Sequence, residues 1–190
     1  TGERIVVDGP IEMQQWNIPS EYLGYPEVER KYLAWDLTVA RPWDGKWSVS
    51  ATYTWAHSWG NYEGSVNSDI GQTDAGITQS FDYPGLVDYS NGDLPNDKRH
   101  TIKLNGSYAF TEELMAGFNF RWQTGRPKNC FGVHPTDNGA KRYGASSFYC
   151  VELDPESDPD NPEYISVPSP RGSAGETKNT INLDLNLTYN

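Results

Sequence analysis

Hydrophobic and polar residues alternate along residues 32–55, with one interruption. Apolar side chains recur at every second position from Leu33 to Val39 and again from Trp47 to Trp55, with small or polar residues between them. A sustained period of two is typical of β-strands that have one apolar and one polar face. The interrupting residues, Pro-Trp-Asp-Gly-Lys, have the composition of a tight turn. The pattern therefore predicts a long antiparallel hairpin.

The same alternation returns further along the chain. The sequence predicts strands near residues 32–41, 47–58, 98–110, 114–124 and 179–189. Short turns alternate with two long polar segments, 57–97 and 125–178, and connections of that length are usually functional or mobile. Residues 1–31 lack a clean period, and we interpret them as a loop, with a short hairpin, that leads into the first strand.

The strand pattern is compatible with two environments. In a soluble sandwich, two sheets cover each other's apolar faces. In an outer-membrane barrel, the apolar face contacts lipid and the polar face lines a wet lumen. Strand length favours the barrel, because a tilted strand needs about 9 to 11 residues to cross the hydrocarbon layer. The polar faces favour it too, because they carry groups that are costly in a dry core; these groups are Asp36, Lys103, Asn105, Arg121 and Asp184.

We therefore predict an all-β fold, an antiparallel transmembrane β-barrel sector in which those five residues face the lumen. The segments 57–97 and 125–178 are then extracellular loops. Five strands are too few to close a barrel, since the smallest have about eight. The remainder of the barrel is thus an expected partner of this chain.

Charge and composition exclude several classes of protein. With 26 acidic against 15 basic residues the formal net charge is -11, which argues against nucleic-acid binding. No apolar run approaches the roughly 18 residues of a membrane helix. Aromatic residues make up 13% of the chain, which argues against disorder. The first residues lack the basic and apolar segments of a signal peptide, so we expect that it was removed or that the sequence is an internal piece.

Cysteine and histidine usage points to structure rather than catalysis. Cys130 and Cys150 lie in one polar, Pro- and Asp-rich stretch, which favours a structural disulfide over a metal site with four ligands. His57, His100 and His134 are far apart, at strand ends or in loops, and are expected to be polar groups of the rim. No nucleophile elbow, phosphate loop or zinc motif is present. We expect a protein that is not an enzyme and that uses no cofactor or metal.

The long segments contain candidate binding residues. Aromatic side chains and nearby carboxylates would line an extracellular ligand vestibule, although packing between loops explains them equally well. The aromatic candidates are Trp59, Tyr62, Phe81 and Tyr83, and the carboxylates are Asp69, Asp74 and Asp88. Lys98, Arg99 and Arg126 lie where loops meet strands, and would pair with lipopolysaccharide phosphates or with loop carboxylates. The acidic run 154–160 offers oxygen ligands for calcium, but its prolines favour a solvated loop.

An ordered set of motifs resembles one family of membrane proteins, the TonB-dependent outer-membrane receptors. The likeness is to the carboxy-terminal barrel region of the Oar-like group, which has a carboxypeptidase-regulatory-like amino-terminal domain. The matching stretches are 41–47, 53–61, 94–100, 124–127, 129–132, 143–150 and 170–175. The resemblance implies a bacterial outer-membrane barrel of 22 strands, plugged by an amino-terminal domain and energised by the TonB complex. No stretch of the sequence matches the plug or the TonB box.

The first hypothesis is thus a portion of a TonB-dependent transporter, which takes up an unidentified extracellular ligand. Its expected partners are outer-membrane lipid, lipopolysaccharide, the plug and the TonB complex. A surface barrel used for adhesion or protein interaction is the second hypothesis. A soluble β-sandwich binding module is the third. Uptake that depends on the proton gradient separates the first two hypotheses, and partition into detergent separates both from the third.

Overall fold

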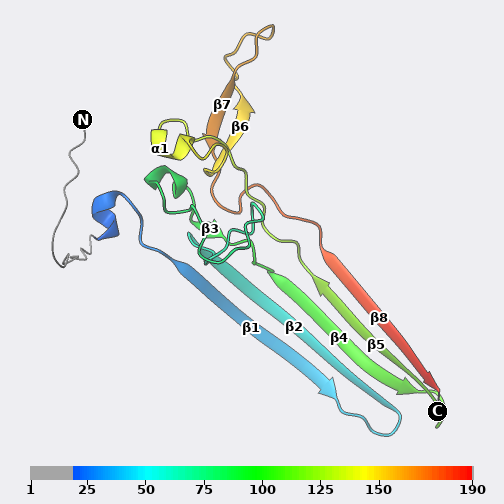
Figure 1. Ribbon diagram of the computed structural model, residues 1–190. Helices are drawn as coiled ribbons and strands as arrows, with labels where there is room; N and C mark the ends of the chain where they lie inside the picture. Colours follow the sequence, from blue (N-terminus) through cyan, green and yellow to red (C-terminus); the bar gives the residue numbers. More distant parts are fainter. Residues whose placement is uncertain (1–18, 190) are drawn as a thin grey trace, which may run out of the picture.

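The computed structural model describes residues 19–189, and nearly all of its regular structure is antiparallel β-sheet (Figure 1). The elements in chain order are η1 (Ser20–Leu23), β1 (Arg30–Arg41), β2 (Trp47–Gly60), η2 (Pro84–Leu86), β3 (Gly92–Asp93), β4 (His100–Ala109), β5 (Leu114–Gln123), α1 (Asn138–Lys141), β6 (Tyr149–Leu153), β7 (Tyr164–Pro168) and β8 (Thr180–Tyr189). No helix in residues 19–189 has the length and hydropathy needed to cross a membrane.

The long strands form a single sheet in the order β1-β2-β4-β5-β8, and the two-residue β3 pairs with the end of β2. Short turns join β1 to β2 and β4 to β5 at one end of this sheet, and the long segments gather at the other end (Figure 1). The all-β class, the antiparallel pairing and the existence of these strands are confirmed. Within residues 19–189, β1 and β8 are edge strands that do not pair with each other.

The register places like side chains side by side. Trp35 of β1 lies opposite Trp55 of β2. Phe120 of β5 lies between Leu104 of β4 and Leu183 of β8. Because directly opposed residues of an antiparallel pair share a face, these rows build one continuous apolar face.

The β1–β2 turn is fixed by its own residues. Gly45 has a φ of +95°, a conformation that glycine adopts at little cost. The Asp44 carboxylate accepts hydrogen bonds from the backbone N–H groups of Lys46 and Trp47, at 2.9 and 3.0 Å. Those bonds, Trp47 first, together with the Arg41 guanidinium, hold the pKa of Asp44 well below its usual range.

Burial is inverted relative to a soluble β-protein. The apolar face of the sheet is open along the edge strands, and Leu185 of β8 is 73% exposed. Large side chains that are exposed on this face are Leu33, Trp35, Leu37, Val39, Ile181, Leu183, Leu185, Leu187 and Tyr189. The buried apolar residues lie instead in the long segments and at the adjoining end of β2: Ala56, Leu86, Val87, Leu94, Ala140, Phe148 and Tyr149.

The long segments contain more regular structure than the sequence pattern predicted. Trp59 and Gly60, which lie beyond the predicted strand 47–58, continue β2, because they pair with Lys31 and Arg30 of β1. The second segment contains α1 and the β6–β7 hairpin, neither of which we predicted. The short hairpin predicted within residues 1–31 falls partly on residues 1–18, outside the described residues; residues 19–29 hold η1 and irregular chain.

Candidate functional site

The two long segments, residues 61–99 and 124–179, fold together at one end of the sheet, and we call them the loop cap (Figure 1). Arg171 of the second segment donates from Nε to the backbone oxygen of Ser90 in the first, at 2.5 Å. Asn129 of the second donates to the Asp69 carboxylate of the first, at 2.6 Å. The cap is therefore one packed unit in which the two segments hold each other.

A buried carboxylate lies at the centre of the cap. The Asp69 side chain is 5% exposed and lies 3.6 Å from the Arg171 guanidinium, which is 6% exposed. A second cation, Arg126, lies 3.9 Å from Asp69. Burial raises the pKa of Asp69 above its ordinary value, and Arg171 and Asn129 act in the opposite direction. We predicted Asp69 as a ligand-binding residue, and the structure places its carboxylate inside the cap, against these partners.

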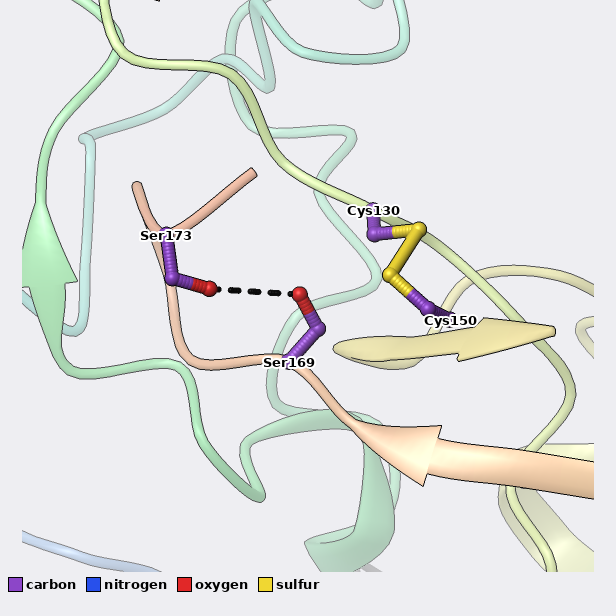
Figure 2. The surroundings of a disulfide bond; sticks show 4 residues. All are labelled: Cys130, Cys150, Ser169 and Ser173. Atoms are coloured by element: carbon purple, nitrogen blue, oxygen red, sulfur yellow. Dashed lines mark hydrogen bonds between the residues drawn. A yellow bond between two sulfur atoms is a disulfide. The ribbon is translucent and has the colours of Figure 1, made fainter. Parts of the chain in front are cut away.

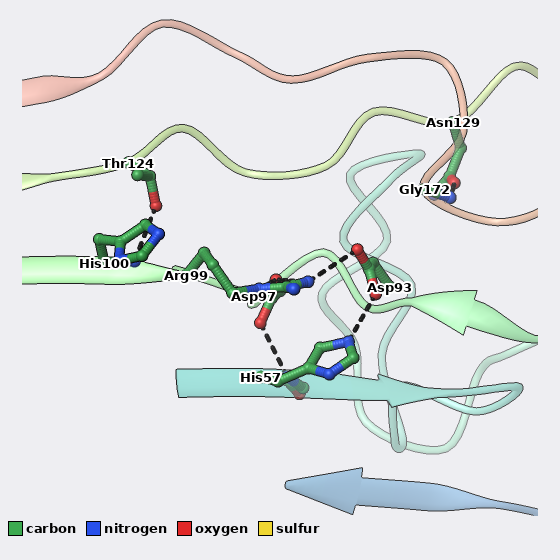
Figure 3. Close-up of polar contacts among 9 residues, drawn as sticks. His57, Asp93, Asp97, Arg99, His100, Thr124, Asn129 and Gly172 are labelled. Carbon is green, nitrogen blue, oxygen red and sulfur yellow. Dashed lines mark hydrogen bonds and ion pairs between the residues drawn. The ribbon is translucent and has the colours of Figure 1, made fainter. Parts of the chain in front are cut away.

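The junction between sheet and cap is a network of charged groups (Figure 3). Arg99 donates to the carboxylates of Asp93 and Asp97, at 2.9 and 3.0 Å. His57 Nε2 lies 2.7 Å from Asp93, and the buried Asp97 accepts the backbone N–H of Ser58 at 2.7 Å. The sequence analysis considered lipopolysaccharide phosphates and loop carboxylates as partners of Arg99, and in the structure Arg99 pairs with loop carboxylates. The network ties the start of β4 to the end of β2.

Lys98, the neighbouring cation, lies among positive charges. Burial lowers its pKa, and the nearby Arg126 and Arg121 lower it further, while Asp97 acts against them. Along the sheet, Lys103 of β4 lies directly opposite Arg121 of β5. Cations are thus concentrated on the polar face just below the cap.

The residues predicted to face a lumen all lie on that one polar face. Asn105 lies opposite Asn119, which in turn lies opposite Asp184 of β8. At the β1 side, Asp36 accepts a hydrogen bond from the hydroxyl of Thr54. Pairing places Lys103 and Arg121 in the adjacent row. A shared polar face is therefore observed, and a lumen stays a prediction.

A disulfide joins Cys130 to Cys150, the two cysteines that the sequence pattern paired (Figure 2). Cys150 lies in β6, so the bond attaches the base of the β6–β7 hairpin to Cys130, which lies in irregular chain just before the bridge between Gly132 and Ser147. Nearby, the hydroxyls of Ser169 and Ser173 lie 3.3 Å apart in the chain that returns toward β8. The disulfide thus braces the second segment from within.

The predicted vestibule aromatics are distributed over the cap. Tyr62 and Phe81 are in edge contact, with ring centroids 5.8 Å apart, and Tyr83 lies 5.9 Å from Tyr143. Trp59 belongs to β2 and is separate from them. The Asp74 carboxylate is in an exposed part of the first segment. The structure brings Tyr62 and Phe81 together, and it does not gather all of the predicted residues around one hollow.

One enclosed cavity inside the cap is very small. The cavity between Ile70, Leu86 and Phe148 has a volume of about 10 Å³, roughly enough for one water molecule. A shallow hollow of about 440 Å³ lies on the outside, between Glu29, Tyr89 and Pro170. None of the predicted vestibule residues lines either space.

His134 is the most deeply placed of the histidines, at 4% exposure. Its Nδ1 accepts the backbone N–H of Asp137 at 2.8 Å, so Nε2 carries the hydrogen that is directed at Asp88, 3.0 Å away. The ring also packs edge-on against Tyr149. These contacts give His134 a structural position in the cap. His57 and His100 lie at strand ends, where we predicted rim groups.

The acidic run 154–160 forms the tip of the β6–β7 hairpin. Asp154 and Asp158 each accept the backbone N–H two residues further on, from Glu156 and Asp160, at 2.9 Å. Among residues 19–189, no group of three or more His, Cys, Asp or Glu side chains has a geometry suited to a metal ion.

A comparison with curated proteins found a partial relative. The TonB-dependent transporter Oar of Myxococcus xanthus is 33% identical over 114 residues, or 58% of this chain. The chain spans about 11% of the length of that protein. This stretch is similar to part of that transporter. No family model matches the chain, and no solved structure does.

Several residues that organise the cap were not identified by the sequence analysis. Arg171 and Asp97 gave no signal, because their partners lie far away in the sequence or in irregular chain. Asp137 was detectable: it directly precedes α1 and accepts the N–H groups of Gly139 and Ala140, as a helix N-cap does. The β6–β7 hairpin was detectable as well, from two short alternating runs on either side of a turn-rich stretch.

Proposed function

We propose that this chain is a sector of the wall of a TonB-dependent outer-membrane transporter, with the loop cap on the extracellular side. The observation that carries the proposal is the sheet itself. One face is continuous and apolar, and its side chains are open on the edge strands, where Leu37 is 58% and Leu187 69% exposed. The other face carries Lys103, Arg121 and Asp184. Lipid on one side and a wet lumen on the other satisfy both faces.

The ends of the sheet support the same orientation. Large aromatic side chains collect at the short-turn end, where Trp43, Tyr108, Phe110 and Tyr189 are all exposed. Trp and Tyr are enriched at the two membrane–water interfaces. Outer-membrane barrels have short periplasmic turns and longer extracellular loops, and this chain has short turns at one end and the loop cap at the other (Figure 1).

The edges of the sheet explain why the chain is only a sector. β1 and β8 have one paired side each among the described residues, and open strand edges are not tolerated in lipid. Both strands therefore pair with further strands of the same barrel. We propose a transport role without enzymatic chemistry. The plug, the TonB complex and an extracellular ligand are partners of the whole protein.

Site-directed labelling in intact cells tests this orientation. Asp74→Cys in the cap should react with a membrane-impermeant maleimide, whereas Glu112→Cys in the β4–β5 turn should react only after lysis. On β8, a spin label at Leu185→Cys should contact oxygen dissolved in lipid, and one at Asp184→Cys should contact a water-soluble relaxation agent. Equal water access at these neighbouring positions would contradict a lipid-facing wall.

A further inference from the structure

The β6–β7 hairpin, residues 149–168, is the part of the cap that extends furthest from the sheet, and we call it the arm (Figure 1). Its two strands pair only with each other among residues 19–189. Tyr149, at the base of β6, is 6% exposed and packs on Tyr89 and His134. Together with the Cys130–Cys150 disulfide, this packing fixes the base, so that the arm projects in a defined direction.

One face of the arm carries a row of large side chains that begins at the buried Tyr149 and continues outward into solvent. Val151 and Leu153 follow Tyr149 at every second position, and Tyr164 lies opposite Leu153, so all four share a face. Tyr149 is buried, whereas Val151, Leu153 and Tyr164 are 58%, 54% and 67% exposed. An apolar strip therefore leaves the cap interior and ends in solvent.

The same arm is strongly and uniformly acidic. The residues from 149 to 170 contain no Lys, Arg or His. Their carboxylates are Glu152, Asp154, Glu156, Asp158, Asp160 and Glu163. None of these six forms an ion pair with a described residue. Asp154 and Glu163 close the strands beside Leu153 and Tyr164, because the Asp154 N–H donates to the Glu163 backbone oxygen at 2.9 Å.

We propose that the strip formed by Val151, Leu153 and Tyr164 docks a cationic segment of a partner protein, in which apolar residues alternate with Lys or Arg. The segment adds as a strand along an open edge of the hairpin, so that its apolar residues continue the strip and its cations lie on the opposite face, which carries Glu152. Charge selects this occupant: a second copy of the chain and the phosphates of lipopolysaccharide both carry the same sign as the arm. The proposal does not depend on where the sheet resides.

A binding assay on the full-length protein, purified in detergent, tests the proposal. The probe is a short fluorescent peptide in which Lys alternates with Val and Thr, and the matched control peptide has Glu in place of every Lys. Anisotropy should report binding of the Lys peptide and no binding of the Glu peptide. The affinity should fall as salt is raised, because ionic pairs at an exposed rim are screened.

Variants separate the apolar strip from the charges. The double variant Leu153→Ser/Tyr164→Ser should weaken binding by about tenfold or more, as the loss of central apolar contacts does in other interfaces. The variant Glu152→Gln/Asp154→Asn/Glu163→Gln should weaken binding and flatten its salt dependence. The control Ile77→Ser removes an apolar side chain of the cap that is also 67% exposed but outside the arm, and should change nothing.

Three results would overturn the proposal. The first is that the wild-type protein does not bind the Lys peptide, as would be found if other loops of the full-length protein already cover the strip. Another is that the Glu peptide binds equally well. The last is that Leu153→Ser/Tyr164→Ser binds as the wild type does. A thiol assay that finds Cys130 and Cys150 oxidised in every variant verifies that the base of the arm is intact.

Discussion

The sheet and the loop cap are stabilised in opposite ways. The sheet is held by backbone pairing, and its edge strands expose large apolar side chains such as Leu185. The cap has little regular structure, yet it contains most of the buried residues, including the ion pair of Asp69 with Arg171. In a soluble protein the strands surround the core and the loops are exposed.

This inversion indicates which medium each region is suited to. A region that must fold against water buries its apolar groups internally, and the cap does so with Leu86, Leu94 and Phe148. The strands keep their apolar groups on the outside, which is stable where the surrounding medium is itself apolar, as in the proposed bilayer. The predictions below test this contrast, beginning with the largest effect.

Removal of the central cation should disrupt the cap and spare the sheet. Arg171→Met leaves the buried Asp69 carboxylate with the Asn129 hydrogen bond and the more distant cation Arg126, and breaking one partner of a buried pair typically costs about 3 to 5 kcal/mol. Limited proteolysis should cut residues 61–99 and 124–179 much faster, while strand protection from hydrogen exchange persists. The double variant Asp69→Asn/Arg171→Met should recover part of the loss. Equal protection in wild type and Arg171→Met would contradict a central role for this pair.

A charge on the apolar face should destabilise the sheet and spare the cap. Leu185→Arg should cost about 2 to 4 kcal/mol, the range for a cation at the bilayer midplane. Its neighbour Asn186 points to the opposite face, so Asn186→Arg is the matched control and should cost little. Urea titration of the full-length protein in lipid vesicles, followed by heat-dependent gel mobility, measures both. Similar costs for the two variants would show that both faces of β8 meet the same medium.

Loss of the disulfide should loosen the cap to a smaller extent. The Cys130→Ser/Cys150→Ser variant opens a link that spans 20 residues, and a bond of that span contributes about 3 kcal/mol. Hydrogen exchange should accelerate in the β6–β7 hairpin first, because Cys150 lies at its base. Ser169→Ala, which changes only a neighbouring hydroxyl contact, should leave exchange in the hairpin near that of the wild type. Equal hydrogen-exchange rates in the wild type and in the double serine variant would contradict a bracing role for the disulfide.

The smallest expected effect depends on pH and is confined to α1. Hydrogen bonds from Ala140, Gly85 and Gly139 lower the pKa of Asp137 below its unfolded value of about 3.9. The stabilisation is therefore complete above the unfolded pKa and is lost as the pH falls through the folded pKa. As the pH falls through the folded pKa, hydrogen exchange of the α1 backbone amides, corrected for intrinsic rates, should become faster. Asp137→Asn should abolish this dependence, and Asp137→Ala should cost about 1 kcal/mol at neutral pH.

The sheet was largely predictable because its information is local. A period of two in Leu33 to Val39 specifies a strand and both of its faces, and the turn residues Asp44 and Gly45 determine which strand it pairs with. The end of β2 was predicted too early. Trp59 and Gly60 extend it through pairing with β1 and β3, and that pairing has no signal at those positions alone.

The cap was much less predictable because its contacts join distant residues. Asn129 reaches Asp69 across 60 positions and Arg171 reaches Ser90 across 81. Composition identified the carboxylates and cations of the two segments but not which pairs would be buried. The sequence predicted Asp69 as a ligand-binding group, and it gave no indication that the carboxylate would lie against Arg171; the binding role stays a prediction.

The register between β2 and β4 has an evolutionary consequence. The first segment of the cap leaves β2 after Gly60, pairs with it again through β3, and re-enters the sheet at His100, opposite Trp55. The segment that departs from β5 likewise returns to the adjacent β8, with Gln123 opposite Thr180. Insertions and deletions between these anchors alter neither strand order nor pairing. The pairing of the strands is thus separate from the length of the two segments, while the contacts of Asn129 and Arg171 require the segments to change together.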